Sequence, residues 1–293
     1  MTRLLEKAIP VFAWVCGAIL LGAIGSALGY LLLKGLHTID LALVFGDTDP
    51  VAALLLERRV FNGLFPAMVG TVLLVVLSVG FAVPIGVTAG IYLAEYAEGG
   101  AKRFFNLLFD VLAGLPSIVI GLVGFSVAVF LNRFLSGRLQ PCLLVSSVAL
   151  AFLVLPYVIR TTQVALENLP AHSRMTALAL GANRLQNLFR VLLPQSLPGL
   201  LSGIILAIGR CAEDTAVIML TGVVASAGVP QSLLSNYEAL PFYIYYVSSQ
   251  YADQRELATG YGASILLLLI CLLLFCLAFV IRKGVTYRAL YRA

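Results

Sequence analysis

The chain has 293 residues, of which 61% are hydrophobic and only 11% are charged. Soluble domains carry about a quarter charged residues, so this composition excludes an ordinary water-soluble protein and indicates an integral membrane protein. The net charge of +5 accompanies a mean hydropathy of +1.01, and we interpret it as a signal of membrane orientation that gives no support to a nucleic-acid partner.

Six apolar stretches are long enough to cross a hydrocarbon core of about 30 Å, which takes about 20 helical residues. They predict an all-α membrane protein with six transmembrane helices. The first stretch exceeds the roughly 7–15 apolar residues of a signal peptide, so we interpret it as an uncleaved helix. The expected spans are Ile9–Leu33, Phe65–Ala94, Leu107–Leu131, Pro141–Ile159, Pro198–Val224 and Gly262–Ile281.

Lysine and arginine are more frequent in the loops on the N-terminal side of these spans than in the opposite loops. By the positive-inside rule, both termini are expected in the cytoplasm. Residues 1–293 are then expected to form a single transmembrane domain, with one large cytoplasmic loop over about 161–197.

The cytoplasmic loop has the pattern of two short helices. Met175 and Leu178 lie at helical spacing, and Gly181 is placed to end the first helix. Asn183 is placed to cap a second helix, which prolines at its end are expected to stop. From periodicity alone, the pair could equally be interfacial helices that lie on the membrane. The second helix is expected over Arg184–Leu193, with Pro194 and Pro198 after it.

A cluster of charges falls inside the fifth span, at Arg210, Glu213 and Asp214. An arginine near mid-bilayer costs about 2.5–3.5 kcal/mol on insertion scales, so it needs partners. Spacings of three and four residues place both carboxylates on the helical face of Arg210. Such a face can line a path for an anion, because a guanidinium supplies paired donors, or it can be a buried salt bridge that only fixes helix packing.

Three other charges lie near the ends of the expected spans. Arg160 ends the fourth span, where it can be an ordinary positive-inside anchor. We expect Asp110, at the beginning of the third span, to be an interfacial N-cap. Glu95 is expected to be a solvated carboxylate at the end of the second span.

Motifs for nucleotide hydrolysis, metal binding and redox chemistry are absent from the sequence. No G-x-x-x-x-G-K-[ST] phosphate-binding loop is present, so we expect that the chain does not bind and hydrolyse nucleotide by that route. The five cysteines include no Cys-x-x-Cys pair, and the two histidines, His37 and His172, lie far apart. We therefore expect no metal site, no cofactor and no catalytic residues.

The loop pattern of a short helix, Leu180-Gly181, a basic amphipathic helix and V-L-L-P resembles the EAA loop of ABC-importer permeases. In that family the first helix of the loop docks in a groove of a cytoplasmic ATPase. Met175 and Thr176 stand at the Glu and first Ala positions of the motif, and Ala177 matches the next Ala. The resemblance implies that the ATPase contacts Met175, Thr176, Ala177, Leu180 and Gly181.

Four further stretches have a characteristic order and spacing. They are NGLFPAMVGT (Asn62–Thr71), GIYLAEYA (Gly90–Ala97), LAGLPSIVIGL (Leu112–Leu122) and LPYVIRTT (Leu155–Thr162). Together they resemble the phosphate-specific transport permeases of the PstA type. The resemblance implies a type I ABC-importer permease fold and a subunit for import of inorganic phosphate. It also implies three kinds of partner, namely a second homologous permease, a cytoplasmic ATPase dimer and an outer-side phosphate-binding protein.

The charged residues depart from this family at two places. The similar permeases carry A-R-A-x-G-E-T where this chain has Arg210, so that Glu213 replaces the Gly and Asp214 replaces the Glu. They carry R-T-T-E where this chain has Arg160 followed by Gln163 as the fourth residue. The resemblance implies that the translocation path includes Arg210, Glu213, Asp214 and Arg160. The larger acidic side chain of Glu213 in place of glycine is expected to narrow the path or alter anion selectivity.

Two alternatives remain from the sequence. The first is the same architecture with another oxyanion, such as molybdate or tungstate, or with a small solute such as an amino acid. The second is an ATPase-independent carrier or channel that uses Arg210 and Asp214 as an ion-coupled site. A membrane-embedded enzyme has less support, because no nucleophile is paired with a base.

Overall fold

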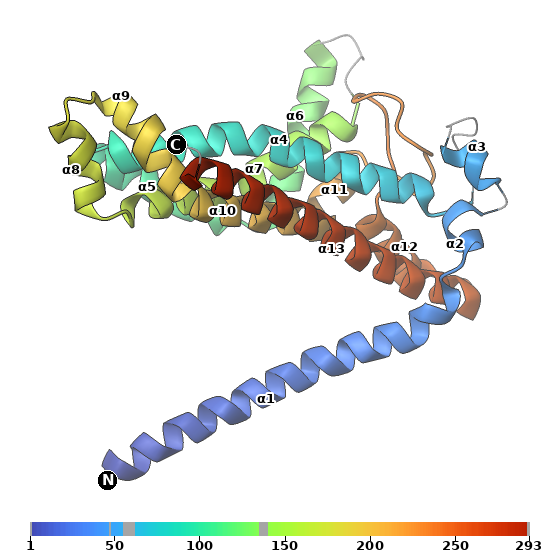
Figure 1. Cartoon of the computed structure of the whole chain (residues 1–293). Helices are drawn as coiled ribbons and strands as arrows, with labels where there is room; N and C mark the ends of the chain where they lie inside the picture. Colours follow the sequence, from blue (N-terminus) through green and yellow to red (C-terminus); the bar gives the residue numbers. More distant parts are fainter. Residues whose placement is uncertain (1, 47, 55–61, 135–139, 292–293) are drawn as a thin grey trace.

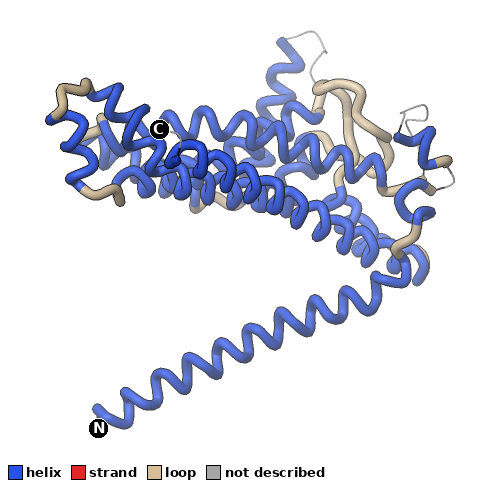
Figure 2. The backbone as a smooth tube through the Cα atoms, viewed as in Figure 1, coloured by secondary structure: helices blue, strands red, loops and turns tan. Residues whose placement is uncertain are grey.

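The computed structural model describes residues 2–46, 48–54, 62–134 and 140–291. Helices and loops make up this part of the chain, as Figure 2 shows. Six of its helices are long and apolar enough to cross a membrane, which confirms the predicted number. They are α1 (Thr2–Gly35), α4 (Phe65–Glu95), α6 (Ser117–Phe134), α7 (Leu143–Glu167), α10 (Leu193–Glu213) and α13 (Gln254–Tyr291).

Shorter helical elements connect the long ones. A 3-10 turn, η1 (Leu36–Thr38), follows α1, and a π-helical segment, η2 (Leu188–Leu192), precedes α10. The other short helices are α2 (Leu41–Phe45), α3 (Pro50–Leu54), α5 (Gly99–Ala113), α8 (Ala171–Ala179), α9 (Arg184–Asn187), α11 (Thr215–Thr221) and α12 (Leu240–Gln250).

The third span begins later than predicted, because the stretch from Leu107 onward divides into α5 and α6. Gly114 ends α5 and donates its N–H to the carbonyl oxygens of Asp110 and Val111. Pro116 has no N–H and disfavours the helical conformation in the residue before it, so a new helix begins at Ser117. Asp110 therefore lies in the last turn of α5, and the prediction that it N-caps the third span is wrong.

The fifth span also differs from the prediction of a continuous helix over Pro198–Val224. Pro194 and Pro198 do not stop the second loop helix, since α9, η2 and α10 run on without a break. The π-helical segment directly before Pro194 accommodates a residue that has no N–H to donate. The helix instead ends at Glu213, because Asp214 has an extended backbone and its carboxylate caps α11 through Val217 N–H at 3.0 Å.

Helix α7 lies at the centre of the bundle and packs along both α4 and α10. Glycines on its two neighbours permit this close approach, because they have no side chain at the contact. A Cβ at Gly86 of α4 would lie 2.7 Å from Cγ1 of Val158, and a Cβ at Gly199 of α10 would lie 2.6 Å from Cβ of Ala165. The same spacing repeats four residues on, at Gly90 and Gly203.

The two ends of the bundle carry different elements (Figure 1). The beginning of α1, the end of α13 and the helices α8 and α9 lie at one end, whereas α2, α3 and α12 lie at the other. Helix α1 leaves the bundle and contacts α13 near its own C-terminal end, and its apolar span has no buried residues. We name the end with α8 and α9 the loop end, and the opposite end the α12 end.

Candidate functional site

Arg210 contacts both carboxylates that its spacing predicts. Its Nη1 lies 2.7 Å from Oε1 of Glu213, and its Nη2 lies 3.7 Å from Oδ2 of Asp214. The two acids differ in environment, since the Glu213 side chain is 63% exposed and the Asp214 side chain is 4% exposed. Asp214 already serves as the cap of α11, so Glu213 is the exposed partner of the arginine at this helix break.

Arg210 and Glu213 line a cavity of about 580 Å³ between α7, α10 and α13. Its polar lining also includes Tyr157 and Ser202, which the sequence pattern did not single out. Arg210 Nε is buried and has no hydrogen-bond partner in the described part of the chain. The Arg210 side chain as a whole is 38% exposed, so an anion in the cavity can reach its exposed part, although the buried Nε itself is not accessible.

Arg160 belongs to a second polar network, between α5 and α7. Its Nη2 lies 2.6 and 2.7 Å from the two carboxylate oxygens of Asp110, and its Nε donates to Oδ1 of the same residue at 3.1 Å. Nη1 donates to Asn106 Oδ1 and to Gln163 Oε1, each at 3.1 Å. Every nitrogen of this guanidinium is therefore occupied, in contrast to Arg210.

Gln163 connects the Arg160 network to a carboxylate one turn further along α7. Its side-chain amide donates to Glu167 Oε1 at 3.0 Å, and the same oxygen lies 2.7 Å from Nζ of Lys102. Gln163 is thus a neutral bridge between Arg160 and Glu167. This link was not visible in the sequence, because Lys102 and Asp110 come from α5.

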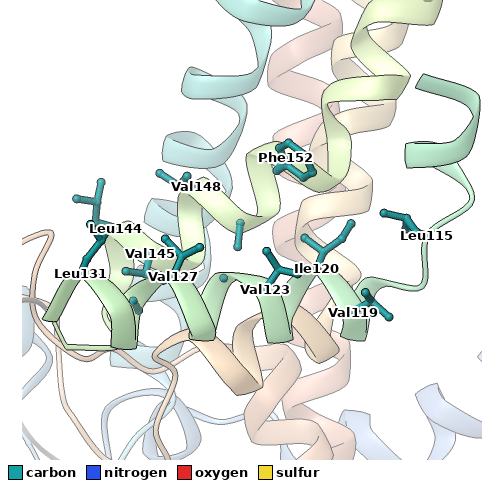
Figure 3. A pocket seen from close by; sticks show the side chains of 13 residues that line it. Leu115, Val119, Ile120, Val123, Val127, Leu131, Leu144, Val145, Val148 and Phe152 are labelled. Atoms are coloured by element: carbon teal, nitrogen blue, oxygen red, sulfur yellow. The ribbon is translucent and has the colours of Figure 1, made fainter. Parts of the chain in front are cut away.

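A second cavity, of about 390 Å³, lies between α6 and α7 and is lined entirely by apolar residues (Figure 3). Among the residues labelled in the view are Ile120, Val127 and Phe152. An anion in this cavity would lose its hydration without meeting any donor, which costs several kcal/mol or more. The polar cavity beside Arg210 is therefore the better candidate for an anion path.

The loop between α7 and α10 has the helix–glycine–helix form predicted from the sequence. Gly181 adopts the left-handed conformation with φ +86°, which ends α8 and turns the chain toward α9. Asn183 caps α9 in a reciprocal pair, because its Oδ1 accepts from Gln186 N–H at 2.7 Å and its own N–H donates to Gln186 Oε1 at 3.0 Å.

Large apolar side chains on this loop face outward from the bundle. Leu180 is 83% exposed and Met175 is 68% exposed, which is unusual for apolar residues gathered on one short segment. Thr176 is exposed, while Ala177 is partly buried. The apolar loop surface, as we name it, consists of Met175, Leu178, Leu180, Leu185 and Phe189.

Polar contacts attach the loop to the bundle at Arg174. Its Nη1 lies 2.6 Å from Oε1 of Glu95 at the end of α4, and its Nη2 donates to the carbonyl oxygen of Leu166 in α7 at 2.5 Å. The prediction that Glu95 is a solvated carboxylate is wrong, since its side chain is only 17% exposed and paired. The spacing of residues along the sequence gives no signal for this contact, which joins positions 79 residues apart.

Comparison with known proteins places the chain in a family. Residues 86–287 match the model of the binding-protein-dependent transport system inner membrane component. The chain is 33% identical to the phosphate transport system permease protein PstA of Yersinia pestis, over 82% of this chain and 77% of that protein. It is also 33% identical to PstA of Haemophilus influenzae, over 73% of this chain and 74% of that protein.

Solved structures of ABC transporters share the fold. A bacterial ABC transporter involved in the import of the acidic polysaccharide alginate has a chain that is 16% identical, with a TM-score of 0.63 over 92% of this chain and 96% of that one. An inward-facing conformation of the MetNI methionine ABC transporter has a TM-score of 0.58 at 19% identity, over 81% of this chain and 99% of that one.

These matches agree with the helical architecture and with the resemblance drawn from the motifs. Six apolar helices together with the family match indicate a multi-pass inner-membrane protein. The chain belongs to the binding-protein-dependent transport system inner membrane components and, within them, to the permeases of the PstA type.

Proposed function

We propose that the chain is the membrane-spanning permease subunit of an ATP-driven importer for inorganic phosphate. The relatives that cover most of the chain are phosphate transport permeases by name. The observation that carries the proposal is Arg210, whose side chain is 38% exposed and lines the cavity of about 580 Å³. A phosphate ion entering this cavity meets a cationic donor that is already in place.

Glu213 gives this site the weak binding that transport requires. Its carboxylate holds Arg210 Nη1 at 2.7 Å while remaining 63% exposed, so an anion can compete with it for the guanidinium. A carboxylate next to the arginine also prevents the anion from being held too tightly to leave. Asp214 keeps its position as the cap of α11 and contributes only a longer contact of 3.7 Å.

Arg160 is the second cation on the proposed path. It lies near the loop end of α7, where Asp110 holds it in a bidentate pair. An anion that leaves toward the cytoplasm would replace Asp110 as the partner of this guanidinium. The proposed path therefore runs from Arg210, which is only partly paired, to Arg160, whose guanidinium nitrogens all have partners.

The apolar loop surface is the proposed contact with a cytoplasmic ATPase dimer. Docking there removes exposed leucine, methionine and phenylalanine side chains from water, which is the main driving force of association. Met175, Thr176, Ala177, Leu180 and Gly181 lie on or next to this surface. The remaining proposed partners are a second homologous permease and a phosphate-binding protein at the α12 end.

The proposed orientation has both termini in the cytoplasm, together with the loop. The beginning of α1 and the end of α13 lie at the same end of the molecule as α8 and α9, as this topology requires (Figure 1). The arginines of the loop agree with the positive-inside rule.

Competition between oxyanions tests the substrate. The assembled transporter is reconstituted in proteoliposomes, and uptake of radiolabelled phosphate is measured with ATP on the side of the loop. Unlabelled phosphate is expected to reduce the uptake of label, whereas sulfate, molybdate and tungstate are expected to leave it unchanged. Equal competition by molybdate would assign the chain to another oxyanion, and uptake without ATP would favour an ATPase-independent carrier.

A further inference from the structure

We propose that Arg174 is a positioning residue that fixes α8 to the ends of α4 and α7, so that movement of the loop is transmitted to both helices together. This inference rests on the proposed function, in which the loop is the contact with the ATPase. It adds a named mechanical link that neither the loop motif nor the family match supplies.

Helix α8 has few other attachments to the bundle. Its backbone packs against α9 and η2, which are themselves parts of the loop. In the described ranges, the pair between Arg174 and Glu95 is the one ion pair that joins the loop to a transmembrane helix. The loop also packs on α4 and α7 through the buried Leu188 and Leu192 of η2, and Arg174 adds the direct polar attachment of α8 to these two helices.

The two acceptors of Arg174 belong to different helices. Glu95 is the last residue of α4, and Leu166 lies in the last turn of α7, where its carbonyl oxygen also accepts from the N–H of Leu169 at 3.1 Å. A cation at this position also interacts favourably with the C-terminal end of the α7 dipole. The fork of the guanidinium allows one side chain to bind both acceptors at once, which a lysine ammonium on a single stem does less well.

The main chain of Arg174 is fixed as well. Its carbonyl oxygen accepts from Nδ2 of Asn187 at 3.0 Å, and Asn187 is the last residue of α9. Asn187 and the following Leu188 are both buried. Arg174 is thus held by α9 on one side and by α4 and α7 on the other, which joins both loop helices to the bundle.

Burial distinguishes this pair from an ordinary surface salt bridge. The side chains of Arg174 and Glu95 are 27% and 17% exposed, whereas exposed pairs contribute little because water screens them. Three charge-assisted or buried hydrogen bonds at one residue resist displacement of α8 in more than one direction. A force applied at the apolar loop surface is therefore expected to reach α4 and α7 rather than to tilt α8 alone.

The first experiment measures the mobility of α8 in the purified chain. A spin label is placed at Ala179→Cys, an exposed position at the end of α8, in a background with Cys16→Ser and Cys276→Ser. We expect Arg174→Ala to narrow the lines of the spin-label spectrum markedly, because α8 becomes more mobile. Arg174→Lys is expected to have an intermediate effect. Arg190→Ala is the matched control, because Arg190 is exposed in the same loop and makes no ion pair in the described ranges. An unchanged spectrum in Arg174→Ala would overturn the proposal whatever the protein transports.

The second experiment measures coupling in the assembled transporter. We expect Arg174→Ala to lower the phosphate moved per ATP hydrolysed by about tenfold, the loss typical of a charge-assisted hydrogen bond, while the ATPase still co-purifies. Arg174→Lys is expected to retain part of this ratio. The double variant Glu95→Arg with Arg174→Glu, which exchanges the two charges, is expected to move more phosphate per ATP than either of its single changes. A wild-type ratio in Arg174→Ala rejects the link. Absence of ATP-driven phosphate uptake in the wild type rejects the proposed function instead, and the mobility of α8 then decides on Arg174.

Discussion

Arg210 differs from Arg160 in how much of its guanidinium is already bound. Arg160 uses all of its nitrogens on Asp110, Asn106 and Gln163, whereas Arg210 has an unpartnered Nε and a carboxylate partner that is mostly exposed. An anion can therefore bind Arg210 without first breaking a bidentate pair. At Arg160 it has to replace a carboxylate that makes three short contacts.

Replacement of Arg210 tests its role in transport. Arg210→Ala is expected to abolish phosphate uptake, because it removes the cation and donor of the cavity, while assembly with the ATPase is retained. Uptake is measured in proteoliposomes, and co-purification reports assembly. Arg255→Ala, at an exposed position near the beginning of α13, is the control and should transport normally. Full phosphate uptake by Arg210→Ala would show that Arg210 acts only in helix packing.

Glu238 is a buried carboxyl at the α12 end of the molecule. Its Oε1 accepts from the backbone N–H groups of Ala227 and Gly228, at 2.8 and 2.7 Å. Burial raises the pKa of Glu238 above its ordinary value of 4.5, and the two backbone donors counter this only in part. The folded protein therefore binds a proton at this site more tightly than the unfolded chain does.

A pH dependence of stability follows from this site. Because the folded pKa is raised, the stability from protonated Glu238 is present below pH 4.5 and is lost as the pH rises through the folded value. Glu238→Gln keeps the acceptor oxygen but cannot ionise, so its unfolding temperature should fall less than that of the wild type over this range. Unfolding in detergent is monitored by the loss of helical circular dichroism. Parallel pH curves for the two proteins would contradict the assignment.

Close helix packing at the centre of the bundle depends on glycines at particular positions. A Cβ at Gly90 would lie 2.8 Å from the carbonyl oxygen of Ile159, a backbone atom that cannot move aside easily. Gly80, on the same helix, has nothing within 4 Å of the corresponding point. The sequence contains both glycines, and only the packing of α4 on α7 distinguishes them.

The two glycines should therefore respond oppositely to the same substitution. Gly90→Ala is expected to destabilise the protein by about 1–3 kcal/mol, the usual result of overpacking. Gly80→Ala is expected to be neutral or to stabilise by up to about 1 kcal/mol, because alanine favours the helix. Thermal unfolding followed by circular dichroism measures both variants, and equal effects would show that α4 and α7 pack differently from this structure.

Gly181 sets the angle between the two loop helices. Its φ of +86° is unfavourable for residues with a side chain, and no neighbouring atom lies within 4 Å of a Cβ added there. Any effect of substitution thus comes from the backbone conformation rather than from a clash.

Substitutions at Gly181 are expected to differ in effect according to how well the new residue tolerates the left-handed backbone conformation. Gly181→Val should cost about 1–2 kcal/mol in the turn and reduce co-purification of the ATPase, whereas Gly181→Asn should be close to wild type. Pull-down of the ATPase through a tag on the permease measures the effect. A normal yield with valine would show that the ATPase does not require this turn.

At the scale of the whole molecule, the long helices separate an end with α8 and α9 from an end with α12 (Figure 1). The loop end carries the apolar loop surface and the Arg174 attachment, and the α12 end carries the buried Glu238. A membrane around the long helices would place these two surfaces in different compartments.

Accessible cysteines test this arrangement. Ala179→Cys should react with a membrane-impermeant reagent only in inside-out vesicles, and Ser232→Cys, exposed at the opposite end, only in intact cells with a permeable outer barrier. The wild-type chain serves as the blank. Labelling of Ala179→Cys from outside the cell would reverse the proposed orientation and separate the loop from any cytoplasmic ATPase.

The sequence by itself determined the features that depend on local physics. Apolar runs of sufficient length predicted the six spans, and a glycine and a capping asparagine at the right spacing predicted the turn between α8 and α9. The contact of Arg210 with Glu213 and Asp214 was also predictable, because residues three and four positions apart share a helical face.

Only the tertiary structure decided the features that depend on distant partners. The structure also corrected the bounds of the third and fifth spans, where local caps and proline geometry end helices at Gly114 and Asp214 within a continuing apolar pattern. The pairs Arg160–Asp110 and Arg174–Glu95 join residues 50 and 79 positions apart, and no periodicity relates them. A side chain's partner across the bundle is set by how helices pack, and that packing is a property of the assembled chain rather than of any segment.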